Sequence, residues 1–94
     1  MKEYPTDEEL DEITKWDYKD FKGLMDYVST LWNWPNYFKK EGNKFTLVTG
    51  GWSGNESIIS ALQDNRMFWT MCWYSSQRGG LYVFEIFVIE EEKK

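Results

Sequence analysis

The clearest structural signal in this chain is an apolar stripe with the spacing of an α-helix. Over residues 18–32 the apolar side chains recur three and four positions apart, at Phe21, Leu24, Met25, Val28, Leu31 and Trp32. This spacing predicts a helix with one buried face. Asp17 is its expected N-cap. Trp34-Pro35 ends it, because proline disfavours helical backbone at the preceding residue.

Two other helices are marked by capping-box patterns, in which a hydroxyl residue is followed three positions later by an acid. Thr6 with Glu9 predicts a first helix that ends near Lys15. Ser53 with Glu56 predicts a third helix over residues 54–64.

Apolar runs between the turn signals predict a small sheet. Strands are expected at 44–49, 67–74 and 81–89, with a short edge strand at Tyr37-Phe38 and a turn over 75–80. The run at 67–74 is apolar on both faces, which is typical of a central strand. We therefore expect one α+β domain over residues 1–94 in the order α-α-β-α-β-β: two N-terminal helices, then a mainly antiparallel sheet with one crossover helix and a C-terminal hairpin. The tail at 90–94 is expected to fray.

Aromatic side chains are more abundant than a core of this size requires. The 94 residues include six Trp, six Tyr and six Phe, and each buries roughly 150–250 Å² when packed. Some rings are therefore expected on the surface, where they serve binding. The single cysteine, Cys72, is interpreted as a small core residue, and its lack of a partner predicts a reducing compartment. With no apolar run long enough to cross a membrane, we expect a cytoplasmic protein without membrane contact.

The residues that the chain lacks argue against most catalysis. It contains no histidine and one cysteine, so histidine acid–base chemistry is excluded and a tetrahedral zinc site has too few ligands. We expect a protein that is not an enzyme and that needs no metal or cofactor.

A glycine-rich loop between a strand and a helix is the strongest local motif. It comprises Gly50, Gly51, Trp52, Ser53 and Gly54. A structural turn is the preferred interpretation, because the spacing matches no nucleotide-binding fingerprint. The alternative is a ligand loop at a helix N-terminus, assisted by Arg78 and by Trp34 and Trp52. These two loop tryptophans are suited to stacking on a base or to anchoring a protein.

Acidic residues gather at the front of the chain. The net charge is −5, and residues 1–26 hold nine acids against four bases. This sign argues against direct nucleic-acid binding. On their own, the acids need do no more than solvate two helices. A second interpretation is an acidic face for a basic partner, formed by Asp7, Glu8, Asp11, Glu12, Asp17, Asp20 and Asp26.

Three segments resemble a family of small uncharacterised bacteriophage and prophage proteins: TGGWSGNESII at 49–59, MFWTMCW at 67–73 and RGGLYVFEI at 78–86. The resemblance extends through residues 16–25. It implies a phage accessory protein in a bacterial host and transfers no catalytic residue.

Under that resemblance, we expect an inhibitor of a host defence protein with a basic surface, similar in manner to anti-CRISPR proteins. The first alternative is a module that sequesters a nucleotide or another small ligand through the glycine-rich loop. The second is a structural or assembly protein of the virion, for which the partner is another copy of the chain.

Overall fold

The computed structural model describes residues 4–86 and has an α+β fold. Its helices are α1 (Asp7–Thr14), α2 (Phe21–Leu31), α3 (Ser53–Asp64) and α4 (Arg66–Cys72), and its strands are β1 (Phe38–Glu41), β2 (Lys44–Val48), β3 (Trp73–Gln77) and β4 (Leu81–Glu85). Two 3-10 turns, η1 (Tyr18–Asp20) and η2 (Pro35–Tyr37), complete the order. The expected frayed tail and the end of the predicted strand 81–89 lie outside the described residues.

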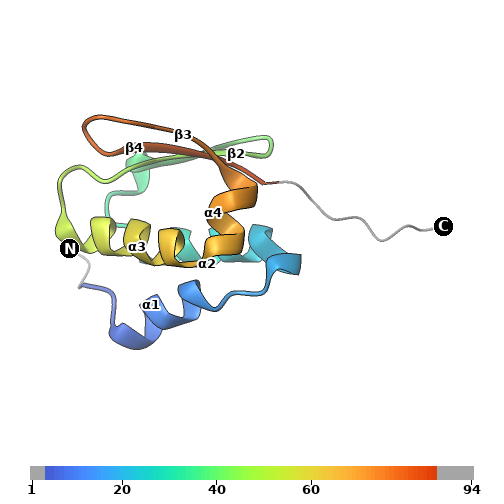
Figure 1. Ribbon diagram of the computed structural model, residues 1–94. Coiled ribbons are helices and arrows are strands. Elements are labelled where there is room, and N and C mark those ends of the chain that lie inside the picture. The colour runs from blue at the N-terminus through green and yellow to red at the C-terminus, as the bar shows by residue number, and fades with distance from the viewer. Residues whose placement is uncertain (1–3, 87–94) are drawn as a thin grey trace.

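The four strands form one antiparallel sheet in the order β1-β2-β4-β3. Burial alternates along β2, where Phe45 and Leu47 are buried and their neighbours are half-exposed. Phe45 lies opposite Phe84 across the β2–β4 ladder, so the buried side chains of both strands share one face. The helices lie against that face (Figure 1), and the other face has no helix over it.

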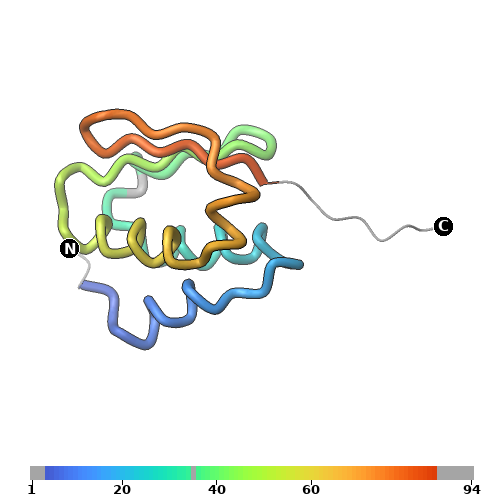
Figure 2. The backbone as a smooth tube through the Cα atoms, in the orientation of Figure 1, coloured from blue at the N-terminus to red at the C-terminus, as the bar shows by residue number. Residues whose placement is uncertain are grey.

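The helices form two levels beneath the sheet (Figure 2). α2, α3 and α4 lie next to the sheet, and α1 packs on α3 from the side away from it (Figure 1). The largest fully buried side chains come from both helices and strands: Trp32, Phe68, Phe84, Ile13, Leu24 and Leu47. The core therefore fills the space between the sheet and the helices.

The first two predicted helices are present, with one change at the start of the second. Thr6 and Glu9 form the expected capping box of α1, with both reciprocal hydrogen bonds made. Asp17 does cap a helical segment, but the segment is the 3-10 turn η1. Asp20 caps α2 proper by accepting a hydrogen bond from the Gly23 amide at 3.1 Å. The helix predicted over 18–32 is thus a 3-10 turn followed by an α-helix.

The predicted strand at 67–74 is wrong, because this segment forms α4 and only its end enters β3. Asn65 begins the helix by accepting a hydrogen bond from the Phe68 amide at 3.1 Å. Phe68 and Cys72, four positions apart, are its buried residues, which is the spacing of one helix face. A run that is apolar at nearly every position fits the 3.6-residue period of a helix and the two-residue period of a strand equally well. The strand that follows, β3, is an edge strand, and it occupies the first half of the predicted turn 75–80.

Asn65 also joins α4 to the first helical layer. Its side-chain amide donates to the carbonyl of Ile13 at 3.0 Å and to that of Trp16 at 3.3 Å. The residue is only 5% exposed, so the three hydrogen bonds of its side chain are shielded from water. One amide therefore fixes the end of α1 relative to the start of α4.

We predict that Asn65→Ala lowers the free energy of unfolding by about 2–4 kcal/mol. It removes an N-cap and leaves two carbonyl groups with one partner fewer inside the protein. Urea unfolding followed by circular dichroism measures the change. Asn36→Ala is the control, because Asn36 is exposed, and its effect should stay within about 0.5 kcal/mol. Equal losses in the two variants would contradict the role given to Asn65.

Cys72 is buried, as its apolar neighbours predicted, and is 2% exposed. Burial raises the pKa of its thiol from 9.0 to about 11, because a thiolate is poorly solvated inside the protein. The folded state therefore holds this proton more tightly than the unfolded state does.

We predict that the Cys72 thiol reacts slowly with Ellman's reagent at pH 8 in the folded protein and rapidly in urea. The stabilising effect of the raised pKa is fully present below pH 9 and is lost as pH rises from about 9 to about 11, since the unfolded chain loses the proton first. In Cys72→Ala the alkaline loss of stability should be smaller. A fast reaction in the folded state would contradict this burial.

Candidate functional site

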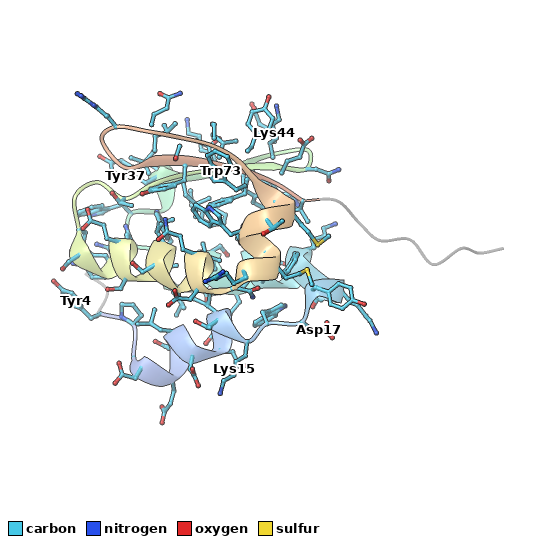
Figure 3. All side chains as sticks on the ribbon, in the orientation of Figure 1. Tyr4, Lys15, Asp17, Tyr37, Lys44 and Trp73 are labelled. Atoms are coloured by element: carbon cyan, nitrogen blue, oxygen red, sulfur yellow. The ribbon has the colours of Figure 1, made fainter. Side chains whose placement is uncertain are left out.

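Four aromatic side chains from three separate segments form a continuous row on one end of the molecule. The ring centroids are 5.5 Å apart for Tyr37 and Trp34, 6.5 Å for Trp34 and Trp52, and 4.9 Å for Trp52 and Tyr4. Tyr4, Trp34 and Tyr37 are 59%, 43% and 40% exposed. Figure 3 shows Tyr4 and Tyr37 at the same end of the molecule. We call these four residues the aromatic row.

Two glycines of the predicted loop lie directly beneath these rings. A Cβ atom at Gly50 would come within 2.6 Å of the Trp34 ring and 2.7 Å of the Tyr37 ring. At Gly54 it would come within 2.2 Å of the Trp52 ring. The rings therefore pack directly on the glycine backbone at both positions. The glycine-rich motif thus has a structural role, because it supports the rings of the aromatic row.

The start of α3 differs from its prediction. Trp52 is the N-cap, and no side chain makes a capping hydrogen bond there, so the capping box proposed for Ser53 and Glu56 is wrong. Ser53 is the first helical residue, and its hydroxyl lies 2.8 Å from the Tyr4 hydroxyl in a hydrogen bond. The Trp52 ring folds back over Gly54 instead. The rings of Trp52 and Tyr4 thus lie over the first turn, where an anion would have to bind.

A buried amide holds the two loops of the row together. The Asn55 side chain accepts a hydrogen bond from the Asn33 amide at 3.0 Å and donates to the carbonyls of Asn33 at 3.4 Å and Thr49 at 3.3 Å. Asn55 is 0% exposed. Because Asn33 precedes Trp34 and Thr49 precedes Gly50, these bonds set the position of one ring over its glycine.

Trp34 has a backbone conformation that is unusual for its residue type. Its φ is 60°, in the left-handed region, and it is the only described residue other than glycine with a positive φ. For a bulky residue this conformation costs about 1–2 kcal/mol. It turns the indole toward Gly50, so backbone strain accompanies the placement of an exposed ring.

The structure also brings the turn containing Arg78 near the loop. The Thr49 amide donates to the Gly80 carbonyl at 3.0 Å, and Arg78 is exposed two residues before Gly80. A polar pocket of about 280 Å³ lies between α3 and this turn, and its lining includes Thr49, Glu56 and Gly80. The turn of Arg78 thus meets the start of the loop through Gly80, but Arg78 itself is not among the residues that line this pocket.

The seven acids predicted as a partner face are all exposed, but three already have local roles. Asp11 forms an ion pair with Lys15 at 2.9 Å, and Asp17 and Asp20 cap η1 and α2. Glu12, Asp17 and Asp20 line one surface pocket, whereas Asp7 and Asp11 line a groove of about 320 Å³ between α1 and α3. The acids therefore do not form one uniform face.

Asp7 and Glu8 are the acids that begin α1, directly after Tyr4, Pro5 and Thr6. They are the members of the acidic set that lie nearest along the chain to the aromatic row. Asp26 is exposed on α2, in a different helix. Two of the seven acids thus follow Tyr4 closely along the chain, whereas Asp26 does not.

Sequence reasoning identified Trp34 and Trp52 but missed Tyr4 and Tyr37. Tyr4 lies in a polar segment that carries no motif, and Tyr37 was assigned only to a short edge strand with Phe38. Within residues 4–86, no helix is long and apolar enough to cross a membrane. The same part of the chain has no cluster of three or more metal-ligating side chains.

Comparisons with protein-family models, with curated proteins and with solved structures found no match for this chain.

We predict that Gly50→Ala destabilises the protein more than Gly51→Ala. Both glycines have positive φ, 65° and 80°, so both variants carry similar backbone strain. At Gly50 the new methyl group must also displace the rings of Trp34 and Tyr37, whereas a Cβ at Gly51 meets no atom within 4 Å. The difference in unfolding free energy should be about 1–3 kcal/mol.

Indole N–H signals in ¹H–¹⁵N NMR spectra provide the structural readout. Gly50→Ala should shift the Trp34 signal, and Gly51→Ala should leave it nearly unchanged. Equal stability and equal shifts in both variants would show that Gly50 is not the seat of the Trp34 ring.

Proposed function

We propose that this chain is a binding protein whose aromatic row docks against a partner protein, with the acids that begin α1 favouring a partner that is basic around the contact. The observation that carries this proposal is the row itself. Tryptophan and tyrosine are enriched among the residues that dominate protein–protein binding energies. Here four of them form a continuous set on the surface.

The row is supported by rigid structure, which favours tight binding. Gly50 and Gly54 seat the rings, and Asn55 fixes both loops through buried hydrogen bonds. A preorganised surface loses little conformational entropy when it docks. The side chains therefore need little rearrangement to meet a partner.

Asp7 and Glu8 supply the electrostatic part of the proposal. Both residues are exposed in the first turn of α1 and follow Tyr4 by three and four positions along the chain. Such charges mainly accelerate association with a basic surface and help select it. This use needs only part of the acidic face predicted from the sequence.

The phage resemblance suggests what such a partner is. A small phage protein with an anchoring surface and no identified catalytic group suits the inhibition of a bacterial host protein, including one of a defence system. Sequestration of a nucleotide is the second candidate function, and its support is the Thr49–Gly80 hydrogen bond that brings the turn of Arg78 beside the glycine-rich loop.

The test compares capture of proteins from bacterial lysate by the wild type and two matched variants. Trp34→Asn removes one ring of the row, and asparagine tolerates the left-handed backbone at this position. Trp73→Asn is the control, because Trp73 is 45% exposed against 43% for Trp34 but lies on β3, outside the row (Figure 3).

We expect a stoichiometric protein partner that the wild type and Trp73→Asn retain and that Trp34→Asn loses, measured by quantitative mass spectrometry. Circular dichroism must first show that both variants are folded. A partner retained equally by all three proteins would contradict docking through the row. A bound nucleotide without a protein partner would move the function to the glycine-rich loop and Arg78.

A further inference from the structure

The angles between the rings of the aromatic row restrict what it binds. Neighbouring rings meet at 61°, 61° and 52°, so no neighbouring pair in the row is parallel. A base held between two rings needs them face to face. Tilted rings instead leave V-shaped angles, which fit a compact, non-planar apolar group such as the pyrrolidine ring of proline.

The polar groups of the row point to the same ligand. The indoles of Trp16 and Trp32 donate to backbone carbonyls of this protein. Within residues 4–86, the indoles of Trp34 and Trp52 have no such acceptor. Trp34 is exposed and Trp52 half-buried, so each indole N–H keeps its donor capacity for a ligand. A proline-rich segment in the polyproline II conformation presents carbonyl acceptors that are not used in internal hydrogen bonds.

The acidic residues that follow Tyr4 indicate which charge the ligand carries at one of its ends. Asp7 and Glu8 are exposed and follow Tyr4 by three and four positions along the chain, so we assign their negative charge to the Tyr4 end of the row. A lysine or arginine beside the prolines would gain electrostatic attraction at that end. Aromatic-lined surfaces that bind proline-rich segments are an established mode of peptide recognition.

From these observations we propose that the aromatic row binds a proline-rich segment in the polyproline II conformation, flanked by a basic residue that lies near Asp7 and Glu8. This inference rests on the proposed function and specifies the chemistry of the partner. It places the recognised element in an extended segment rather than in a folded surface.

The test uses synthetic peptides as probes. The first peptide has ten prolines. The second carries an added Arg-Arg pair at its N-terminus, and the third carries it at its C-terminus. Each has a control of equal length and charge in which Gly-Ser repeats replace the prolines. Each peptide is titrated into ¹⁵N-labelled protein while the indole N–H signals are followed. The proline peptides should shift the signals of Trp34 and Trp52, and the Gly-Ser peptides should leave them unchanged.

Variants define the site. Trp34→Asn should weaken binding of the proline peptides by at least about tenfold, and Trp73→Asn should leave it within about twofold, as expected for a residue outside the contact. At low salt, one of the two Arg-containing peptides should bind several-fold more tightly than ten prolines alone. This advantage should disappear in about 1 M salt and in the double variant Asp7→Asn, Glu8→Gln.

The inference is overturned if the proline peptides leave the row's signals unchanged, if the Gly-Ser peptides bind equally well, or if Trp73→Asn rather than Trp34→Asn abolishes binding. It is also overturned if adenosine monophosphate, and no proline peptide, shifts Trp34 and Trp52. A partner that is captured through Trp34 but contacts the row with a folded surface would overturn this inference and leave the proposed function standing. Capture that does not depend on Trp34 would overturn the proposed function itself.

Discussion

The position of the aromatic row depends on the hydrogen bonds of the buried Asn55 side chain. This side chain accepts a hydrogen bond from Asn33 and donates to Thr49, so it joins the end of α2 to the end of β2 from the first turn of α3. Leaving buried polar groups without partners costs about 1–3 kcal/mol each. Alternative placements of the two loops that break these bonds are therefore disfavoured. The same hydrogen bonds restrict the positions of Trp34, which follows Asn33, and of Trp52, which lies in the loop after Thr49.

Two glycines also determine where the rings of the row lie. Gly50 must have a positive φ to leave the strand, and it must lack a side chain so that Trp34 and Tyr37 can approach its backbone. Gly54 has no such φ requirement, yet the Trp52 ring occupies the place of its side chain. The motif that resembles a ligand loop in sequence thus acts as a platform for aromatic rings.

Much of the fold could be predicted because its signals are local. The apolar stripe of α2 and the capping box of α1 depend on residues a few positions apart, and burial of Trp32 and Cys72 follows from their neighbours. The α4 segment could not be assigned by period, because an apolar run such as 67–72 satisfies both helix and strand. Its deciding signal was Asn65, whose side chain caps α4 and also bonds Ile13, 52 positions away.

The candidate site was harder to predict because it is formed by contacts between residues far apart in the sequence. Trp34 and Trp52 stood out as loop tryptophans, but nothing in the sequence shows that Tyr4 reaches Ser53 across 49 positions or that Tyr37 shares a glycine with Trp34. The capping box at Ser53 failed because α3 begins one residue earlier than predicted, which makes Trp52 the N-cap and Ser53 the first helical residue. Pairings such as that of Tyr4 with Ser53 depend on tertiary structure, which the local pattern does not contain.

Trp34 combines backbone strain with surface exposure. A glycine at this position would adopt its φ of 60° without strain and would no longer expose a large apolar ring to water. The tryptophan ring instead joins Tyr37 to Trp52 in the row. Backbone strain that the surrounding structure maintains is a recurrent property of functional sites. The strain at Trp34 is therefore the feature of the fold that agrees with the proposed docking of the row against a partner.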